Sequence, residues 1–191
     1  MNDAPPLPYD LLVVGASAGG VGAVSTLLAG LGPGFPAAVA VVLHIAENRR
    51  SFLDRALAGT LRVREAADKQ PLVAGEVVVA PPGYHLLVED RTSYALSTEA
   101  PVHFCRPAVD PLFETAADVF GPRLAAALLT GANDDGAAGL RTVEAAGGLV
   151  VVQDPDTAEA SMMPRAGIAA CHRPHVAPLP ALAAILTGRA P

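Results

Sequence analysis

Short apolar runs alternate with longer amphipathic stretches along most of the chain. Residues 11–14 and 37–43 are two such runs, and residues 21–31 between them carry apolar side chains at helical spacing. After the second run, residues 49–58 have the composition of a helix. Continuous apolar strands that alternate with helices are typical of a parallel sheet covered on both faces.

The middle of the chain has a different pattern. Three short strand-like runs, at 76–80, 84–89 and 93–96, are separated by Pro81-Pro82-Gly83 and Asp90-Arg91-Thr92. Because turn residues divide closely spaced strands in this way in hairpins, we expect an antiparallel excursion here.

The alternation then resumes, with predicted strands at 124–129 and 149–152 and predicted helices at 107–120, 135–146, 164–170 and 179–186. The expected fold is a doubly wound α/β domain. Its sheet is mostly parallel, with helices on both faces and a short antiparallel excursion in the middle. We expect an acidic, proline-rich tail at 1–9 and a single domain at 10–191, since 191 residues suffice for one substantial core.

Composition and charge exclude several classes of protein and of binding partner. Hydrophobic residues make up 51% of the chain and charged residues 17%, which argues against disorder. The net charge is −6 without a Lys/Arg run, so nucleic acid and anionic lipid are not expected partners. No apolar segment reaches the ~20 residues of a membrane span. With no secretion signal and only Cys105 and Cys171, we expect a cytoplasmic protein without membrane insertion.

Three polar residues follow predicted strands in a chemically complementary set. Ser17 follows the first strand, His44 ends the second, and Asp134-Asp135 follow the strand at 124–129. Ligands of open parallel sheets bind beyond the carboxyl ends of the strands, where these side chains would meet. Serine, histidine and aspartate together provide a nucleophile, its general base and the group that orients the base.

The serine lies in Gly15-Ala16-Ser17-Ala18-Gly19, a match to G-x-S-x-G. In this motif a sharp strand-to-helix turn projects the hydroxyl, and the following helix offers N–H groups to an oxyanion. The chain order Ser, His, Asp differs from the Ser, Asp/Glu, His order of α/β-hydrolases and does not support that superfamily.

Other interpretations remain open at this point. Ser17 and Asp135 are also residues that cap helices, and His44 is also consistent with a structural histidine. The glycines of 15–22 resemble a dinucleotide turn, although Ser17 takes the middle glycine's place. The segment 171–175 contains cysteine and two histidines but lacks a second ligand pair, which favours a surface loop over a metal site. We interpret His85 and His103 as structural or exposed.

A series of collinear motifs resembles the catalytic domain of CheB-type protein-glutamate methylesterases. The likeness runs from about residue 10 to about residue 186. Its motifs are Val13-Val14-Gly15-Ala16-Ser17-Ala18-Gly19-Gly20, Val42-Leu43-His44, Cys105-Arg106-Pro107, Leu128-Leu129-Thr130-Gly131, Asp135-Gly136-Ala137-Ala138-Gly139 and Met163-Pro164-Arg165.

The resemblance implies a serine esterase that hydrolyses γ-glutamyl methyl esters on chemoreceptor signalling helices, and in many members deamidates receptor glutamines. Carried over by position, Ser17 is the nucleophile, His44 the base and Asp135, rather than Asp134, the orienting acid. The resemblance implies no metal or organic cofactor. Expected partners are methylated chemoreceptors and a separate regulatory protein or methyltransferase.

Several positions depart from the family pattern. Ala18 replaces a threonine, Ala132 a methionine, and Cys105 a histidine before the Arg-Pro pair. Backbone N–H groups at Ala18 and Ala132 survive these changes, so an oxyanion hole is not lost with the side chains. Arg106, within the family motif, is expected to steer acidic receptor helices.

Two further expectations concern the regulation of the activity and whether the protein is an enzyme at all. The family's receiver domain is not found before residue 10, so we expect activity without relief of inhibition by such a domain within this chain. The departures at Ala18, Ala132 and Cys105 keep open an alternative, a non-catalytic module of the same fold that binds a receptor or a methyltransferase.

Overall fold

The computed structural model describes residues 7–44, 56–57, 59 and 61–189. Its main feature is a seven-stranded, wholly parallel sheet with the strand order β3-β4-β2-β1-β7-β8-β9. The strands are β1 (Leu11–Ala16), β2 (Ala38–Leu43), β3 (Arg62–Glu65), β4 (Glu76–Val79), β7 (Leu124–Leu128), β8 (Leu149–Gln153) and β9 (His175–Ala177).

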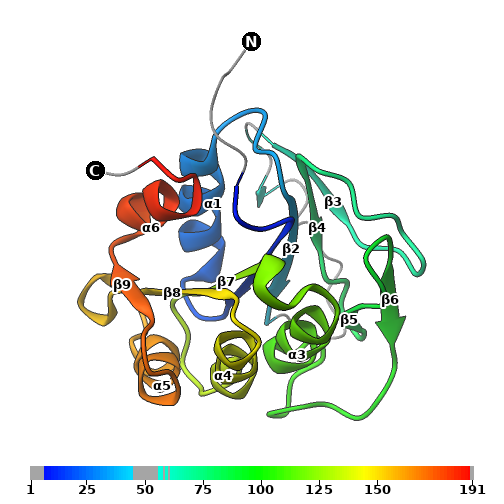
Figure 1. Cartoon of the computed structure of the whole chain (residues 1–191). Coiled ribbons are helices and arrows are strands. Elements are labelled where there is room, and N and C mark those ends of the chain that lie inside the picture. Colours follow the sequence, from blue (N-terminus) through cyan, green and yellow to red (C-terminus); the bar gives the residue numbers. More distant parts are fainter. Residues whose placement is uncertain (1–6, 45–55, 58, 60, 190–191) are drawn as a thin grey trace.

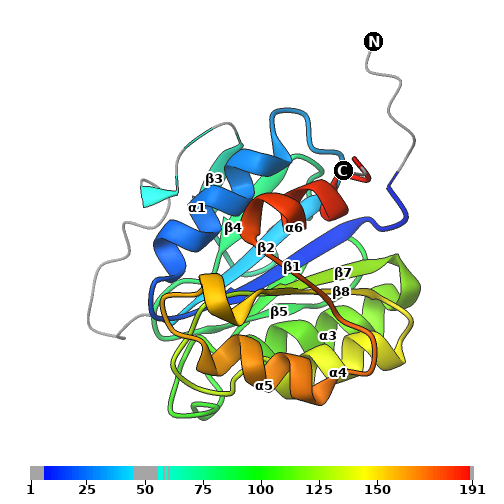
Figure 2. The same cartoon turned by 90° about the vertical axis from the view of Figure 1, so that its left-hand side faces the viewer.

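Helices cover both faces of this sheet, as Figures 1 and 2 show. On one face lie α1 (Gly20–Leu31) and α6 (Leu179–Leu186), which contact each other. On the other lie α3 (Val109–Phe120), α4 (Ala137–Ala145) and α5 (Met162–Ala170). Short 3₁₀ helices occupy Gly121–Arg123 and Pro155–Thr157. The predicted doubly wound α/β class is therefore confirmed.

The central strand β1 shows why a continuous apolar run was required. Leu12 and Val14 pack into the cluster that contains α1 and α6, whereas Leu11 and Val13 pack into the cluster that contains α3 and α4. Successive side chains of a strand point to opposite faces, so a strand covered on both sides needs apolar residues at every position.

The antiparallel excursion is smaller than the sequence suggested. Among the named strands of the described residues, β5 (His85–Val88) and β6 (Tyr94–Ser97) are the one antiparallel pair, and β5 contacts α3. The run at 76–80 instead forms β4, which pairs in parallel with β2 and β3. Its assignment to the excursion was wrong, because a buried apolar run has the same local pattern in either kind of pairing.

Two short edge strands, β3 and β9, were not predicted. The first reads Arg-Val-Arg-Glu and the second His-Val-Ala, so neither has an apolar run, and both complete the sheet by pairing along one side. The predicted helix at 49–58 lies largely outside the described residues.

The packed body begins before residue 10. Leu7 and Tyr9 are buried in the cluster under α1 and α6, and the Tyr9 hydroxyl donates a hydrogen bond to the carbonyl of Leu186. Burial raises the pKa of Tyr9 above its ordinary value. Among the residues that the structure describes, no helix is both long and apolar enough to cross a membrane.

The order of the strands brings three of the predicted site segments to the same end of the sheet. On one side of β1 lie β2, β4 and β3, and on the other lie β7, β8 and β9, so the order of the strands reverses at β1. Where the strand order reverses in this way, the loops that follow the two neighbouring strands run in opposite directions and leave a crevice at the carboxyl ends of the strands. Ser17, His44 and the 130–136 loop follow β1, β2 and β7 at that end.

Candidate active site

The turn that carries Ser17 contains glycines because neighbouring side chains leave no room for a Cβ atom. A Cβ on Gly15 would lie 2.4 Å from a methyl group of Val109, and one on Gly20 would lie 2.6 Å from Leu43. Gly19 has φ 74°, which disfavours other residues. The chain therefore passes from β1 into α1 through a turn that only small residues permit, with Ser17 half-buried within it.

The hydroxyl of Ser17 does not cap the helix. The N-cap position of α1 is Gly19, and no side chain caps it. The backbone of Ser17 is fixed instead: its N–H donates to the carbonyl of Thr130 at 2.9 Å, and its carbonyl accepts from Gly20 at 2.8 Å. The structure thus leaves the hydroxyl available for chemistry on a turn held at both ends.

His44 continues the ladder between β1 and β2. Its N–H donates to the carbonyl of Ala16 at 3.2 Å, which fixes the residue beside the Ser17 turn. The imidazole is 9% exposed, and its Nε2 lies 2.7 Å from Oδ2 of Asp135. Because an ionised carboxylate only accepts hydrogen bonds, Nε2 carries a proton and Nδ1 is the nitrogen able to accept one.

Within the described part of the chain, no hydrogen bond joins the Ser17 hydroxyl to His44. Hydrogen bonds between nucleophile and base are often longer in the absence of substrate and shorten in the reactive complex. The geometry brings His44 and Asp135 into direct contact and places Ser17 at the neighbouring strand end.

Asp135 is fully buried and accepts three hydrogen bonds. Besides His44, its Oδ2 accepts from the N–H of Val109 at 2.7 Å and its Oδ1 from the N–H of Asp110 at 2.9 Å. Burial by itself would raise its pKa, but the hydrogen bonds from His44, Val109 and Asp110 hold the pKa of Asp135 below its ordinary value.

The two backbone donors are the first residues of α3, so Asp135 caps a helix that follows a different strand. The N-cap of its own helix, α4, is Gly136. Free N–H groups at a helix start favour a negative charge. Capping and histidine contact are therefore not alternatives here, because the same carboxylate does both.

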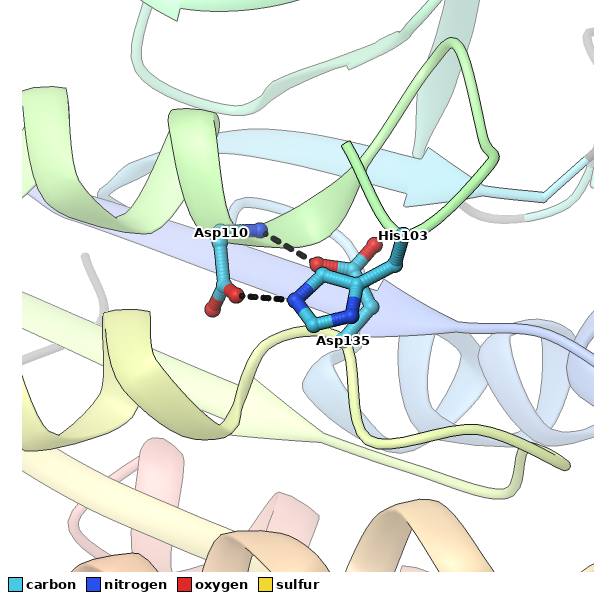
Figure 3. A group of neighbouring side chains, drawn as sticks. All are labelled: His103, Asp110 and Asp135. Carbon is cyan, nitrogen blue, oxygen red and sulfur yellow. Dashed lines mark hydrogen bonds and ion pairs between the residues drawn. The ribbon is translucent and has the colours of Figure 1, made fainter. Parts of the chain in front are cut away.

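The neighbouring Asp134 points elsewhere. Its side chain is 69% exposed, and Oδ1 lies 3.3 Å from Nδ1 of His103. The other nitrogen of that ring, Nε2, lies 3.2 Å from Oδ2 of Asp110. Figure 3 shows His103, Asp110 and Asp135 grouped at the start of α3. His44 and His103 thus each contact a different one of the two adjacent carboxylates.

Asp110 links this group to α4. It is buried, and its Oδ1 accepts from the N–H of Gly139 at 2.7 Å. Burial is the main cause that raises the pKa of Asp110, and the charge of Asp135 acts in the same direction. A Cβ on Gly139 would lie 2.5 Å from Phe113, so glycine is needed where α3 and α4 cross.

The remaining predicted site residues lie on the turn after β1, on the loop after β7 and on the segment before α3. Ala18 is exposed, and its carbonyl accepts from the Thr130 hydroxyl at 2.8 Å; Ala132 is exposed on the loop after β7. Arg106 is half-buried, and its Nη1 donates to the carbonyls of Thr98 and Glu99 at 3.0 and 2.9 Å.

Thr130 and Gln153 are site-supporting residues that the sequence analysis did not single out. Both are buried; Oε1 of Gln153 accepts from Thr130 N–H at 2.9 Å, and Thr130 Oγ1 accepts from Ala160 N–H at 2.9 Å. Thr130 therefore ties the Ser17 turn to the 158–161 segment. A polar residue directly after an apolar strand was the available signal, at both positions.

The histidines interpreted as structural or exposed include one of each kind. His85 is buried, with Nε2 3.1 Å from the Ala100 carbonyl and Nδ1 accepting from Ala108 N–H at 3.3 Å. His103 is exposed but bridges two carboxylates.

Side chains that could bind a metal ion come close together at the start of α3. One group there brings three His, Cys, Asp or Glu ligand atoms within 4.8 Å of one another, namely His103, Asp110 and Asp135. Both Asp135 oxygens already accept hydrogen bonds, so that carboxylate is committed to His44 and α3.

A surface hollow lies between α4, β8 and β9 and is lined by Arg141, Glu144, His172, Arg173 and His175 among others. Two of its backbone donors are occupied, since Glu144 accepts from the N–H groups of His172 and Arg173. None of Ser17, His44 and Asp135 lines it, and we place the chemistry at the strand ends.

Comparison with known proteins gives a consistent result. The family model described as CheB methylesterase matches residues 12–186. The chain is 43% identical over 164 residues to a putative protein-glutamate methylesterase/protein-glutamine glutaminase of Leptospira interrogans, with 85% of each chain covered.

Two other curated relatives are longer proteins. A protein-glutamate methylesterase/protein-glutamine glutaminase of Anaeromyxobacter dehalogenans is 44% identical, over 83% of this chain but 47% of its own length. The protein-glutamate methylesterase FrzG of Myxococcus xanthus is 35% identical, over 95% of this chain and 55% of its own. This chain therefore spans about half the length of these two relatives.

Among solved structures, the catalytic domain of the CheB methylesterase of Thermotoga maritima superposes with a TM-score of 0.87 at 28% sequence identity. The match covers 94% of this chain and 98% of that domain. With a family match over nearly its full length and relatives above 40% identity, the chain belongs to the CheB methylesterase family.

Proposed function

We propose that this protein is a serine esterase that hydrolyses γ-glutamyl methyl esters on chemoreceptors to glutamate and methanol, and that it acts in chemotaxis or a related signalling pathway. Deamidation of receptor glutamines is the same chemistry with ammonia as the leaving group. Family membership supports the reaction class. The observation that carries the proposal is the buried pair of His44 and Asp135 beside the Ser17 turn.

In the proposed reaction, Ser17 Oγ attacks the ester carbonyl while Nδ1 of His44 takes its proton. Asp135 keeps the other proton on Nε2 and stabilises the imidazolium that forms. Collapse of the tetrahedral intermediate breaks the bond to the methoxy group, and His44 returns the proton to release methanol. Water then attacks the acyl-enzyme with His44 again as base, which frees glutamate and Ser17.

Backbone groups are available to stabilise the oxyanion. Within the described residues, the N–H groups of Ala18 and Ala132 have no protein acceptor, and both residues are exposed at the strand ends. Unpaired N–H groups of this kind stabilise a developing negative charge, and that of Ala18 also lies near the start of α1. They support the view that the alanine replacements leave an oxyanion hole in place.

The substrate assignment is narrower than the reaction class. The relatives' names specify protein glutamate and glutamine as targets. We assign the methylated signalling helices of chemoreceptors as the substrate, which implies a cytoplasmic location, and a methyltransferase or regulatory protein as a further partner. Arg106 is assigned to steering acidic receptor helices.

Methanol release tests the proposal. Purified protein is incubated with receptor carrying labelled methyl esters, and Ser17→Ala serves as the matched control. Release by the wild type and not by the variant is expected. Binding of receptor by correctly folded wild type without any methanol would instead support the non-catalytic alternative.

A further inference from the structure

A tight turn beside the candidate site has an uncommon backbone. Val102 and Cys105 exchange two backbone hydrogen bonds, of 3.1 and 2.8 Å, across the two residues His103 and Phe104. Both central residues have positive φ, 48° and 61°. Two-residue turns of this kind favour glycine, asparagine or aspartate, and a bulky residue at positive φ is strained.

The turn is held at its tip and at its base. At the tip, the His103 ring lies between Asp110 and Asp134, 3.2 and 3.3 Å from their carboxylate oxygens. At the base, Arg106 donates to the carbonyls of Thr98 and Glu99. These contacts keep the strained turn in one place despite its exposure.

The same contacts place the turn at the rim of the candidate site. Asp110, which contacts His103, also donates its N–H to Asp135 (Figure 3). Asp135 in turn contacts His44. The thiol of Cys105 is close enough for the charge of Asp135 to add to burial in raising its pKa. Three successive contacts, from His103 to Asp110, from Asp110 to Asp135 and from Asp135 to His44, therefore link the turn to the imidazole of the proposed general base.

Phe104 projects from this turn with its side chain wholly in water. It is 101% exposed, whereas the next most exposed large apolar residue in the described part of the chain, Met162, is 59% exposed. Single exposed apolar residues are ordinary on protein surfaces. Here, however, full exposure coincides with a strained backbone that is fixed by charged contacts, and such strain clusters at functional positions.

We propose that Phe104 determines specificity by packing against an apolar strip of the methylated receptor helix beside the target glutamyl ester. His103 is a positioning residue that holds the turn. The assignment rests on the proposed function: when a glutamyl side chain of a protein reaches Ser17, the protein that carries it must lie over the rim that this turn forms. An exposed aromatic ring is the kind of anchor that dominates protein contacts.

Substitutions can separate docking from folding. Phe104→Asn removes the ring while asparagine tolerates positive φ, so the turn is expected to persist. Phe104→Leu keeps an apolar side chain. The matched control is Val73→Ala, at an apolar residue that is 44% exposed. Val73 precedes β4 and so lies near the amino ends of the parallel strands, whereas the candidate site lies at their carboxyl ends.

The first readout is the kinetics of methanol release from methylated receptor. For Phe104→Asn we expect KM to rise about tenfold with kcat within about twofold of wild type, because a docking contact acts equally on ground and transition states. Phe104→Leu should recover most of the loss, and Val73→Ala should match wild type. His103→Asn should raise KM about threefold and speed amide exchange at Cys105 N–H.

The second readout is the affinity of Ser17→Ala for methylated receptor, with and without Phe104→Asn. We expect the added substitution to weaken Kd about tenfold. Unchanged KM and Kd overturn the docking role, as does a fall in kcat alone. Self-association of the wild type that is lost in Phe104→Asn, without an effect on receptor binding, also overturns it. A wild type that releases no methanol but binds through Phe104 would overturn the proposed function and leave the docking role standing.

Discussion

The contact between His44 and Asp135 and the exposed turn at 102–105 are linked through Asp110 but are held in different ways. Asp135 is fully buried, and backbone N–H groups of α3 fix both of its oxygens. The turn relies on exposed or half-buried side chains: His103 contacts the 69% exposed Asp134, and Arg106 donates to the carbonyls of Thr98 and Glu99. Backbone-fixed buried groups give the precision that proton transfer requires, whereas an exposed rim can change without disturbing the chemistry.

Loss of the proposed nucleophile gives the largest expected effect. Ser17→Ala should lower methanol release at least about a thousandfold, because no other hydroxyl on this turn can attack the ester. Folding should change little, since the hydroxyl caps no helix and the turn is fixed by backbone bonds. Activity retained together with a normal melting curve would remove Ser17 from the mechanism.

Loss of the proposed base comes next. His44→Gln should be nearly inactive, because an amide side chain cannot take the proton of the Ser17 hydroxyl. The measurement is kcat/KM of variant and wild type, with melting curves of both proteins as the check on folding. Activity close to that of the wild type in a normally folded variant would count against a histidine base.

The adjacent carboxylates provide a matched pair. Asp135→Asn should lower kcat at least about tenfold, because an amide favours the wrong imidazole tautomer and removes the charge beside imidazolium. Asp134→Asn, which changes an exposed group that contacts His103, should lower kcat less than about twofold. The reverse order would exchange their roles.

The low pKa of Asp135 also predicts how stability depends on pH. A carboxyl group with a pKa below its unfolded value, about 3.9, stabilises the fold fully above that value and loses this contribution as pH falls through the folded pKa. Wild type should therefore lose more stability than Asp135→Asn in the acid range below about pH 4. Urea unfolding of both proteins from pH 2 to 7 measures the difference, and parallel curves would contradict the assigned shift.

The smallest effect is expected at Arg106. If it steers acidic helices, Arg106→Ala should lower kcat/KM about twofold at low salt, and the difference should disappear at high salt. Arg106→Lys, which keeps the charge, should retain the salt dependence. A loss that is independent of salt would instead reflect the bonds to Thr98 and Glu99 that hold the base of the turn.

The local sequence was sufficient to predict the buried strands and the turn that carries Ser17. A strand covered on both faces must be apolar throughout, and a tight turn packed against Val109 and Leu43 must contain glycine, so both leave a readable pattern. The positions of His44 and Asp135 could be carried over because their motifs are collinear with the family. The edge strands β3 and β9 could not be predicted, because short polar segments become strands only by pairing with a neighbour.

Long-range contacts decided the rest. The sequence alone determined that serine, histidine and aspartate follow strand ends of a doubly wound α/β domain. Only the tertiary structure decided that β4 joins the parallel sheet, that Asp135 caps α3 and bonds Nε2 of His44, and that His103 bridges Asp110 and Asp134. The physical reason is that each of these contacts joins segments far apart in the chain, where no local periodicity or turn signal records which groups will meet.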